Sequence, residues 1–254
     1  MTKRILFILI LFLPLVSAAQ LTETDTLPFG YRLTANGSWI TGNVERLLLI
    51  GTADLYTVHE QWAFRTANTY QYGTIAKNLT ENDLFSRNFF YLHPRQRFYP
   101  YLMAWVETNK RREIALRYQY GPGISWAALS KQDNQLKLSF TLTYESAEYS
   151  RNNFGNSRYD NDPFIETFRG TIRVYGQHRL LNNKLKFRYE CWGQQSFEDR
   201  QNYRLHGEFA LELPLTSMTS FRVGYNYNYE SIVLEGIKKR DGFLLFGIAV
   251  ANFK

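Results

Sequence analysis

The feature of this sequence that most constrains its fold is an alternation of apolar and polar residues with a period of two. Over 220–230 the apolar positions are Phe221, Val223, Tyr225, Tyr227 and Tyr229, and polar or small residues occupy every position between them. Strict alternation of this length places the apolar side chains on one face of a β-strand and the polar ones on the other. The pattern recurs over 203–213, 136–145 and 114–120, and no stretch of similar length keeps a helical period. We therefore predict strands, and no helix, beyond residue 19.

Turn residues divide this region into twelve predicted strands. Their predicted ranges are 30–41, 44–57, 61–73, 83–92, 97–108, 112–127, 135–149, 164–177, 184–197, 202–213, 219–231 and 241–253. In the second, fourth, fifth and twelfth strands both faces carry apolar or aromatic residues. The sequence therefore leaves the inward faces of these four strands unassigned.

The first 19 residues predict export. Lys3 and Arg4 precede an apolar run over 5–16, and the small residues at 17–19 end it. This is the arrangement of a secretory signal peptide. A membrane-anchoring helix is the alternative, but the run is shorter than the about 20 residues that span a bilayer, and Pro14 interrupts it. We expect a signal peptide over 1–19, cleaved after Ala19, and one β-barrel domain over 20–254.

Two architectures could use such strands. A soluble sandwich or lipocalin-like barrel would bury the apolar faces, whereas a transmembrane barrel turns them toward lipid and encloses the polar faces. The predicted strands are longer than the typical soluble strand of about five or six residues and long enough for the about 9–11 residues that cross a bilayer. A mean hydropathy of −0.37 also argues against a bundle of membrane-spanning helices.

Aromatic residues and connection lengths point the same way. Aromatic side chains crowd the predicted strand ends, as in the girdles of membrane barrels: Tyr70, Tyr72, Phe98, Tyr99, Tyr101, Tyr118, Tyr120, Tyr225, Tyr227 and Tyr229. The three longest predicted connections, 74–82, 150–163 and 232–240, all fall on one side, and the turns on the other side are short. The sequence thus predicts an all-β fold, a single antiparallel up-and-down transmembrane β-barrel of about 12 strands. Its predicted location is the outer membrane of a Gram-negative bacterium.

Several motifs resemble one bacterial family. The turn over 41–45 (Thr-Gly-Asn-Val-Glu) and the strand end over 52–56 resemble the opening hairpin of domain-of-unknown-function family 481, also called salt-induced outer membrane proteins. The segments 97–101 and 116–126 resemble the middle section of that family. The chain departs from the pattern with Val44, where Thr is common, and with Pro122 between two glycines. The resemblance runs from about 30 to 253, implies an outer-membrane β-barrel, and supplies no catalytic or ligand residues.

The polar strand faces would line the lumen of such a barrel. Our candidate lumen residues are Arg65, Arg117, Arg169, Arg173, Arg188, Glu190, Arg204, His206, Glu208, Arg222 and Glu230, with Lys137, Glu145, Lys186 and Glu212 beside them. Both signs interleave, with a basic excess. One interpretation is a network of ion pairs that largely fills the lumen of a structural or stress-related envelope protein. The alternative is a narrow channel that favours small anionic solutes.

A lipid-modifying hydrolase of the outer membrane is a second alternative. It would need a Ser-His-acid set near the outer leaflet, but His59, His93 and His178 fall in or beside turns on the opposite side. His206 faces the lumen, where we expect a neighbouring carboxylate, Glu208, to satisfy it. We therefore predict a protein that is not an enzyme, with no catalytic residues, cofactor or metal site.

Charge and composition suggest partners. We expect outer-membrane lipid, the barrel-assembly machinery during insertion, and lipopolysaccharide, whose phosphates suit the cations Lys110, Arg111, Arg112, Lys238, Lys239 and Arg240. The cations are spread along strand faces rather than gathered in a patch, so we expect no nucleic acid. The polar, Gly/Asn-rich loop 150–163 is a candidate contact for a surface partner.

Overall fold

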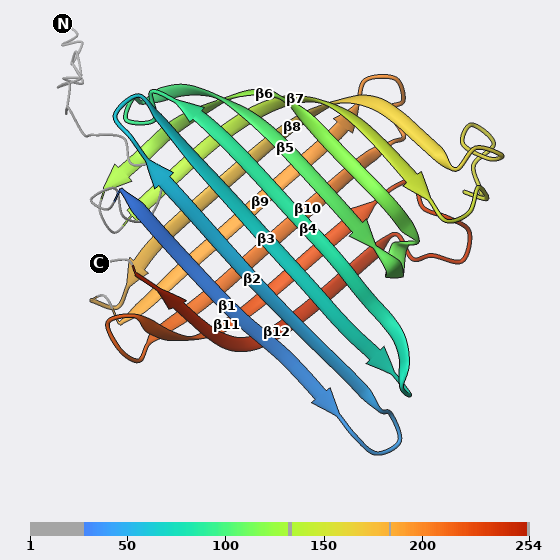
Figure 1. The fold of residues 1–254 in the computed structure, drawn as a ribbon, viewed down its shortest axis with the longest axis horizontal. Coiled ribbons are helices and arrows are strands. Elements are labelled where there is room, and N and C mark those ends of the chain that lie inside the picture. Colours follow the sequence, from blue (N-terminus) through green and yellow to red (C-terminus); the bar gives the residue numbers. More distant parts are fainter. Residues whose placement is uncertain (1–27, 132–133, 183, 253–254) are drawn as a thin grey trace, which may run out of the picture.

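The computed structural model describes residues 28–131, 134–182 and 184–252, and in this part of the chain twelve antiparallel strands form one sheet. The strands are β1 (Phe29–Ile40), β2 (Arg46–Val58), β3 (Trp62–Ile75), β4 (Asn78–Leu92), β5 (Phe98–Asn109), β6 (Ile114–Lys131), β7 (Asn134–Tyr149), β8 (Phe164–Leu180), β9 (Leu185–Ser196), β10 (Tyr203–Pro214), β11 (Thr219–Glu230) and β12 (Arg240–Ala251). Each strand pairs with the next, and β1 pairs with β12, so the sheet closes into a barrel (Figure 1). The predicted all-β, up-and-down, twelve-stranded barrel is confirmed. The predicted signal peptide lies outside the described residues.

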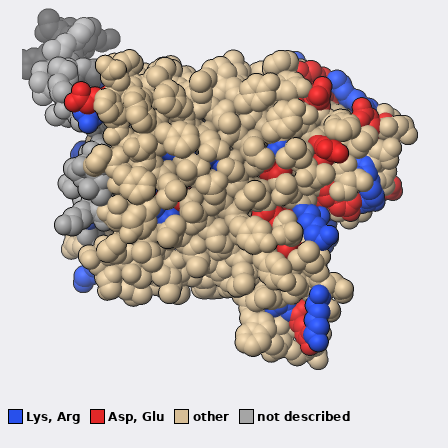
Figure 2. Space-filling view, viewed as in Figure 1, with Lys and Arg blue, Asp and Glu red and all other residues tan. Residues whose placement is uncertain are grey.

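The barrel turns its apolar strand faces outward. Large hydrophobic side chains such as Leu102, Phe168, Ile172 and Leu244 are more than half exposed on the outer wall. Figure 2 shows this wall as an almost uncharged surface, with most of the visible charged side chains gathered at the end that carries the connections after odd-numbered strands. We call this the loop end. No helix in the described ranges is long and apolar enough to cross a membrane.

One predicted connection is wrong. The segment 74–82 was expected to be a long loop, but β3 and β4 continue into a two-residue turn at Ala76 and Lys77. Both residues have positive φ, 47° and 64°, which is the backbone that a tight type I′ hairpin turn requires. Neither is Gly, Asn or Asp, so the usual sequence signal for this turn is missing. The structure also contains a three-residue 3₁₀ turn, η1 (Lys110–Arg112), which periodicity did not predict.

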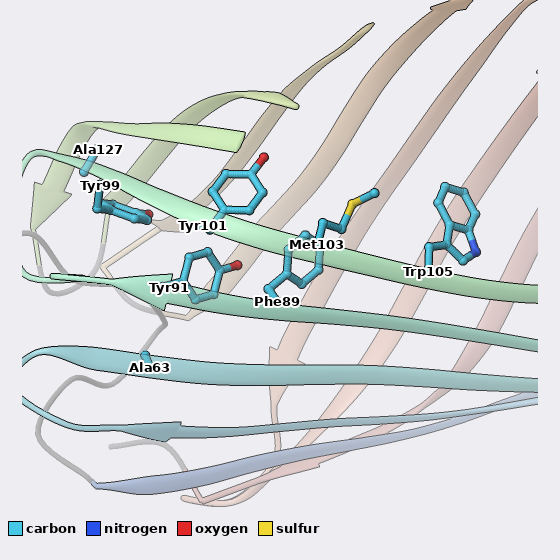
Figure 3. Packing of buried hydrophobic residues seen from close by; sticks show 8 residues of the cluster. All are labelled: Ala63, Phe89, Tyr91, Tyr99, Tyr101, Met103, Trp105 and Ala127. Carbon is cyan, nitrogen blue, oxygen red and sulfur yellow. The ribbon is translucent and has the colours of Figure 1, made fainter. Parts of the chain in front are cut away.

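Tyr99 and Tyr101 are a second correction. They were expected in an outer aromatic girdle, but they are 1% and 4% exposed and point into the barrel. There they pack with Phe89, Tyr91, Met103 and Trp105 from β4 and β5 (Figure 3). Tyr101 lies across Gly123 of β6, its partner in the register, where a Cβ atom would come within 2.4 Å of the ring. The missing side chain at Gly123 leaves room for a large ring on the inner wall.

Two long loops cover part of the mouth at the loop end. We call the segments 150–163 and 231–239 together the loop cap. Phe154, Ile232 and Leu234 of the loop cap are buried against the ends of β6, β7 and β8. The Glu235 N–H donates a hydrogen bond of 2.8 Å to the Asn153 carbonyl and joins the two loops. Beside them, η1 reaches across the mouth, because Arg112 donates to Asp241 of β12 at 2.6 Å.

Candidate functional site

The lumen of the barrel is the candidate site, and the structure places all eleven candidate residues on its inner wall. Each is buried or partly buried. They occupy alternate positions of their strands, which point to the same side of the sheet. The residues, with their strands, are Arg65 (β3), Arg117 (β6), Arg169 and Arg173 (β8), Arg188 and Glu190 (β9), Arg204, His206 and Glu208 (β10), and Arg222 and Glu230 (β11).

Arg117 forms the first cluster of bonds, near the loop end. Its side chain is 2% exposed and donates to both carboxylate oxygens of Glu230, each at 3.0 Å. It also donates to Glu107 at 3.2 Å and to the Tyr149 hydroxyl at 2.9 Å. Because β6 and β11 are not neighbours in the sheet, this pair joins separate parts of the wall through the lumen.

Glu145 of β7 forms the second cluster. Its side chain is 1% exposed and accepts from Arg169 at 3.0 Å and from Arg204. Arg169 is also held by the side-chain oxygen of Asn202 at 2.8 Å. No hydrogen bond reaches the Nε and Nη1 atoms of Arg204 from the described residues. Among the described residues, Glu145 is therefore the one acidic group that pairs with the Arg204 guanidinium.

Further pairs follow toward the other end of the barrel. Glu190 accepts from Arg173 at 2.5 Å and from Arg87 of β4, which lies on a separate part of the wall. Three more arginines pair in the same way: Arg222 donates to Glu208 at 2.6 Å, Arg65 to Asp54 at 2.6 and 2.8 Å, and Arg32 to Glu212. Charge pairing is thus distributed along the lumen.

His206 departs from its predicted environment. Its ring stacks on Trp192 at a centroid distance of 5.0 Å, and Nδ1 lies 2.7 Å from the Asn228 side-chain oxygen. Glu208, the expected carboxylate partner, pairs with Arg222 instead. The wrong assumption was that the nearest inward residue on the same strand would be the partner, whereas adjacent strands supply closer groups. Within the described residues, no group of His, Cys, Asp and Glu could hold a metal ion.

The candidate list missed several lumen residues that complete these pairs. They are Arg32, Asp54, Arg87, Glu107 and Arg112. Arg32 alternates with Tyr31 and Leu33, so periodicity could have identified it. Arg87 could not be assigned, because its strand mixes aromatic residues on both faces, and Arg112 belongs to the unpredicted turn η1.

Within the part of the chain that the structure describes, three cavities follow one another through the barrel. The upper cavity, of about 130 Å³, lies toward the loop end, and the middle cavity, of about 120 Å³, shares six lining residues with it, Arg87 and Glu208 among them. A lower cavity of about 230 Å³ shares Arg32 with the middle one. Their combined lining contains ten Lys or Arg and six Asp or Glu residues. The passage is narrow, interrupted by side chains, and predominantly basic.

Comparisons with known proteins agree with this architecture. A family model described as "Protein of unknown function, DUF481" matches residues 34–251. Among solved structures, the NanC porin is 12% identical with a TM-score of 0.52, over 88% of this chain and 99% of that chain. A bacterial polysaccharide outer membrane secretin is 7% identical (TM-score 0.43; 88% and 97% covered), and the translocator domain of the autotransporter NalP from Neisseria meningitidis is 12% identical (TM-score 0.41; 88% and 86%). The likeness to the NanC porin, at 12% identity, concerns the fold alone. A comparison with curated proteins gives no match.

Proposed function

The chain belongs to the DUF481 family of proteins of unknown function, and from that premise we propose that it is a structural β-barrel of a Gram-negative outer membrane. The family predicted from the motifs over 41–56 and 97–126 is confirmed. We further propose that the chain is exported through a cleaved signal peptide, inserted by the barrel-assembly machinery and surrounded by outer-membrane lipid and lipopolysaccharide.

The apolar outer wall supports the location. Exposed side chains on every second position, from Leu33 of β1 to Ile248 of β12, form a continuous hydrophobic surface. This surface is far larger than the apolar patches that ordinary soluble monomers expose to water. In a bilayer this surface would contact acyl chains. Because the sheet is closed, nearly all strand edges that would face lipid are paired with a neighbouring strand.

The bonds through the lumen are the observation that carries the structural role. Arg117 with Glu230, Arg87 with Glu190, and Arg32 with Glu212 each join strands that are not neighbours in the sheet. The loop cap and η1 cover part of the mouth at the loop end. A lumen crossed by charged pairs and partly covered at one mouth resists deformation and gives little room for solutes.

Planar bilayer recordings test this role. We expect purified wild-type protein to show no steady current. Detergent extraction from outer-membrane fractions and heat-modifiable gel mobility of the same sample would check location and fold. Steady single-channel conductance of the wild-type barrel would contradict the structural role.

A narrow channel for small anions is the second candidate, favoured by the connected cavities and their basic excess. If the barrel conducts, the reversal potential in a salt gradient should indicate anion preference. Replacing Arg32, which lines both the middle and the lower cavity, with Gln should weaken that preference. The matched control is Arg158→Gln in the exposed loop cap. Equal selectivity in both variants would count against the path through these cavities.

We propose no catalytic role. His206 contacts Trp192 and Asn228 rather than a hydroxyl nucleophile, and this supports a structural place for it. The test is hydrolysis of phospholipid by purified barrel in mixed micelles. Turnover that disappears in His206→Gln would support the hydrolase instead.

A further inference from the structure

The seam that closes the barrel ends early at the loop end. The β1–β12 register stops at the pair Gly37 and Phe246, although β1 continues to Ile40 and β12 begins at Arg240. Among the described residues, no register pair joins 38–40 to 240–245, while β1 stays paired with β2 as far as Ile40. The end of the β1–β2 hairpin therefore separates from β12, while β2 stays paired with β3 as far as the pair Arg46 and Ile75 (Figure 1), and this end forms the lobe at the lower right of Figure 2. We call the space between these strand ends the seam opening.

The seam opening lies at the height of the apolar outer wall. Trp39, in the unpaired end of β1, is 81% exposed. Leu49, which pairs with Gly37, is 49% exposed, and Leu244 across the opening is 60% exposed. Apolar side chains of this kind contact lipid in a membrane barrel. The opening would therefore face acyl chains rather than water.

The inner side of the seam opening is apolar as well. Leu48 and Ile50 of β2 are buried against Leu245 of β12, and Phe243 packs on them. These are the strands whose two faces both looked apolar in the sequence. Ile50 and Leu245 line the middle cavity, and Phe243 lines the upper cavity. Apolar side chains thus fill the seam opening, with Leu48, Ile50 and Leu245 only 3–5% exposed, and they form an apolar layer between the lipid-facing wall and the cavities.

Two guanidinium groups lie at the inner end of this surface. The Arg111 guanidinium is 4.5 Å from the centre of the Phe243 ring, and Arg112 has a side chain only 4% exposed. Both line the upper cavity. Both pair with the carboxylate of Asp241, Arg111 at 3.5 Å and Arg112 at 2.6 Å. In the described structure one other acidic group forms an ion pair with either of them. This group is Glu230, which lies 3.8 Å from Arg112 and also pairs with Arg117.

Hydrogen-bond donors remain unused at this point. The Arg111 Nε and Arg112 Nη1 atoms are buried and receive no hydrogen-bond partner from the described residues. A buried donor without a partner carries a free-energy cost, and an anionic acceptor relieves it most effectively. The site therefore combines the apolar side chains at the seam opening with two guanidinium groups that still have free hydrogen-bond donors.

We propose that the upper cavity and the seam opening bind a single-chain amphiphile with an anionic head group. The head group lies at Arg111 and Arg112, and the chain leaves between β1 and β12 along Phe243, Leu245 and Leu48. Because the loop cap and η1 cover part of the mouth above and the seam opening is apolar, the ligand enters from the side. Cavities of this volume are comparable to those that hold a benzene-sized ligand, so they suit a head group and a short length of one chain rather than a two-chain lipid. The proposal rests on the proposed membrane location and is independent of whether the lumen conducts.

Photo-crosslinking with a palmitic acid that carries a diazirine in its chain tests the proposal on the full barrel in zwitterionic micelles. Mass spectrometry should locate adducts on the inward residues Phe243, Leu245 or Leu48, and excess palmitate should compete them away. Adducts confined to lipid-facing residues such as Leu244 and Phe246 would overturn the proposal.

Charge variants test the head-group site. Arg111→Gln with Arg112→Gln should reduce the inner adducts at least tenfold for the acid probe and leave those of the matching alcohol probe unchanged. The control is Lys238→Gln with Lys239→Gln, two exposed cations at the same end. Heat-modifiable mobility checks that each variant is folded. Inner adducts that persist without Arg111 and Arg112 would overturn the anionic head-group assignment. Recovery of the barrel from cells without detergent would instead contradict the membrane location.

Discussion

Replacing Glu145 with Gln should destabilise the barrel through the charges that it leaves behind. The Glu145 side chain is 1% exposed and accepts from Arg169 and Arg204. The substitution keeps the shape of the side chain and removes its negative charge. Arg169 would retain Asn202, at 2.8 Å and 3.3 Å. Arg204 would retain no acidic group in an ion pair within the described structure, where its Nε and Nη1 atoms already lack hydrogen bonds.

The size of the effect follows from this geometry. Breaking a buried ion pair by removing one partner costs about 3–5 kcal/mol. Connected cavities lie near Arg204 and admit water, so we expect the lower end, about 3 kcal/mol, or roughly a hundredfold in the unfolding equilibrium. Adding Arg204→Met removes the orphaned guanidinium, and roughly half of the lost stability should return.

Urea unfolding in micelles, followed by tryptophan fluorescence, measures these changes. Glu148→Gln is the matched control, because it makes the same chemical change at an exposed position of the same strand, and it should stay within about 0.5 kcal/mol of wild type. The reasoning would be refuted if Glu145→Gln unfolded together with this control. It would also fail if the double variant were as unstable as the sum of its two single variants.

Three further predictions concern local structure. Gly123→Ala should lower the free energy of unfolding by about 1–3 kcal/mol, because the new Cβ would meet the Tyr101 ring. The control Gly51→Ala, with nothing within 4 Å of its Cβ, should be tolerated, and equal urea midpoints for the two variants would contradict the prediction. Ala76→Asn with Lys77→Gly should raise the free energy of unfolding by about 1–2 kcal/mol, since both positions have positive φ, and a lower urea midpoint than that of the wild type would contradict the strain. Glu198 lies in the turn after β9, and burial raises the pKa of its carboxyl. Hydrogen bonds from Thr167, the Phe168 N–H and Ser196 lower this pKa by more, so it lies below its usual value. The stability from these bonds is therefore present above the unfolded pKa of about 4.3 and lost as pH falls through the folded pKa; the Phe168 amide resonance should titrate below pH 4.3 in the wild type and not in Glu198→Gln.

The sequence contains much of the information needed to predict the wall of the barrel. Where one face is apolar and the other polar, as over 219–230, a period of two assigns both the strand and its inward residues, because adjacent side chains must point to opposite faces. The same rule placed Arg117, Glu145 and Glu230 in the lumen. It gave no partner for any of them, because Arg117 and Glu230 are 113 residues apart and meet only when the sheet closes.

Periodicity failed where both faces are apolar. Tyr101 turns inward because Gly123 on the next strand leaves space for its ring, and that match exists only once the register is set. Leu48 and Leu245 are similar: they meet through the closure of β1 on β12, near the point where that ladder stops. The turn at Ala76 and Lys77 was hidden because residues without a turn preference adopt it.

By itself, the sequence determined that the chain forms strands with one apolar and one polar face, because the pleat converts spacing along the chain into sides of a sheet. Only the tertiary structure decided which charges pair through the lumen, which aromatic residues turn inward, and where the seam opens. These depend on contacts between residues far apart in the chain, and closure of the barrel brings them together.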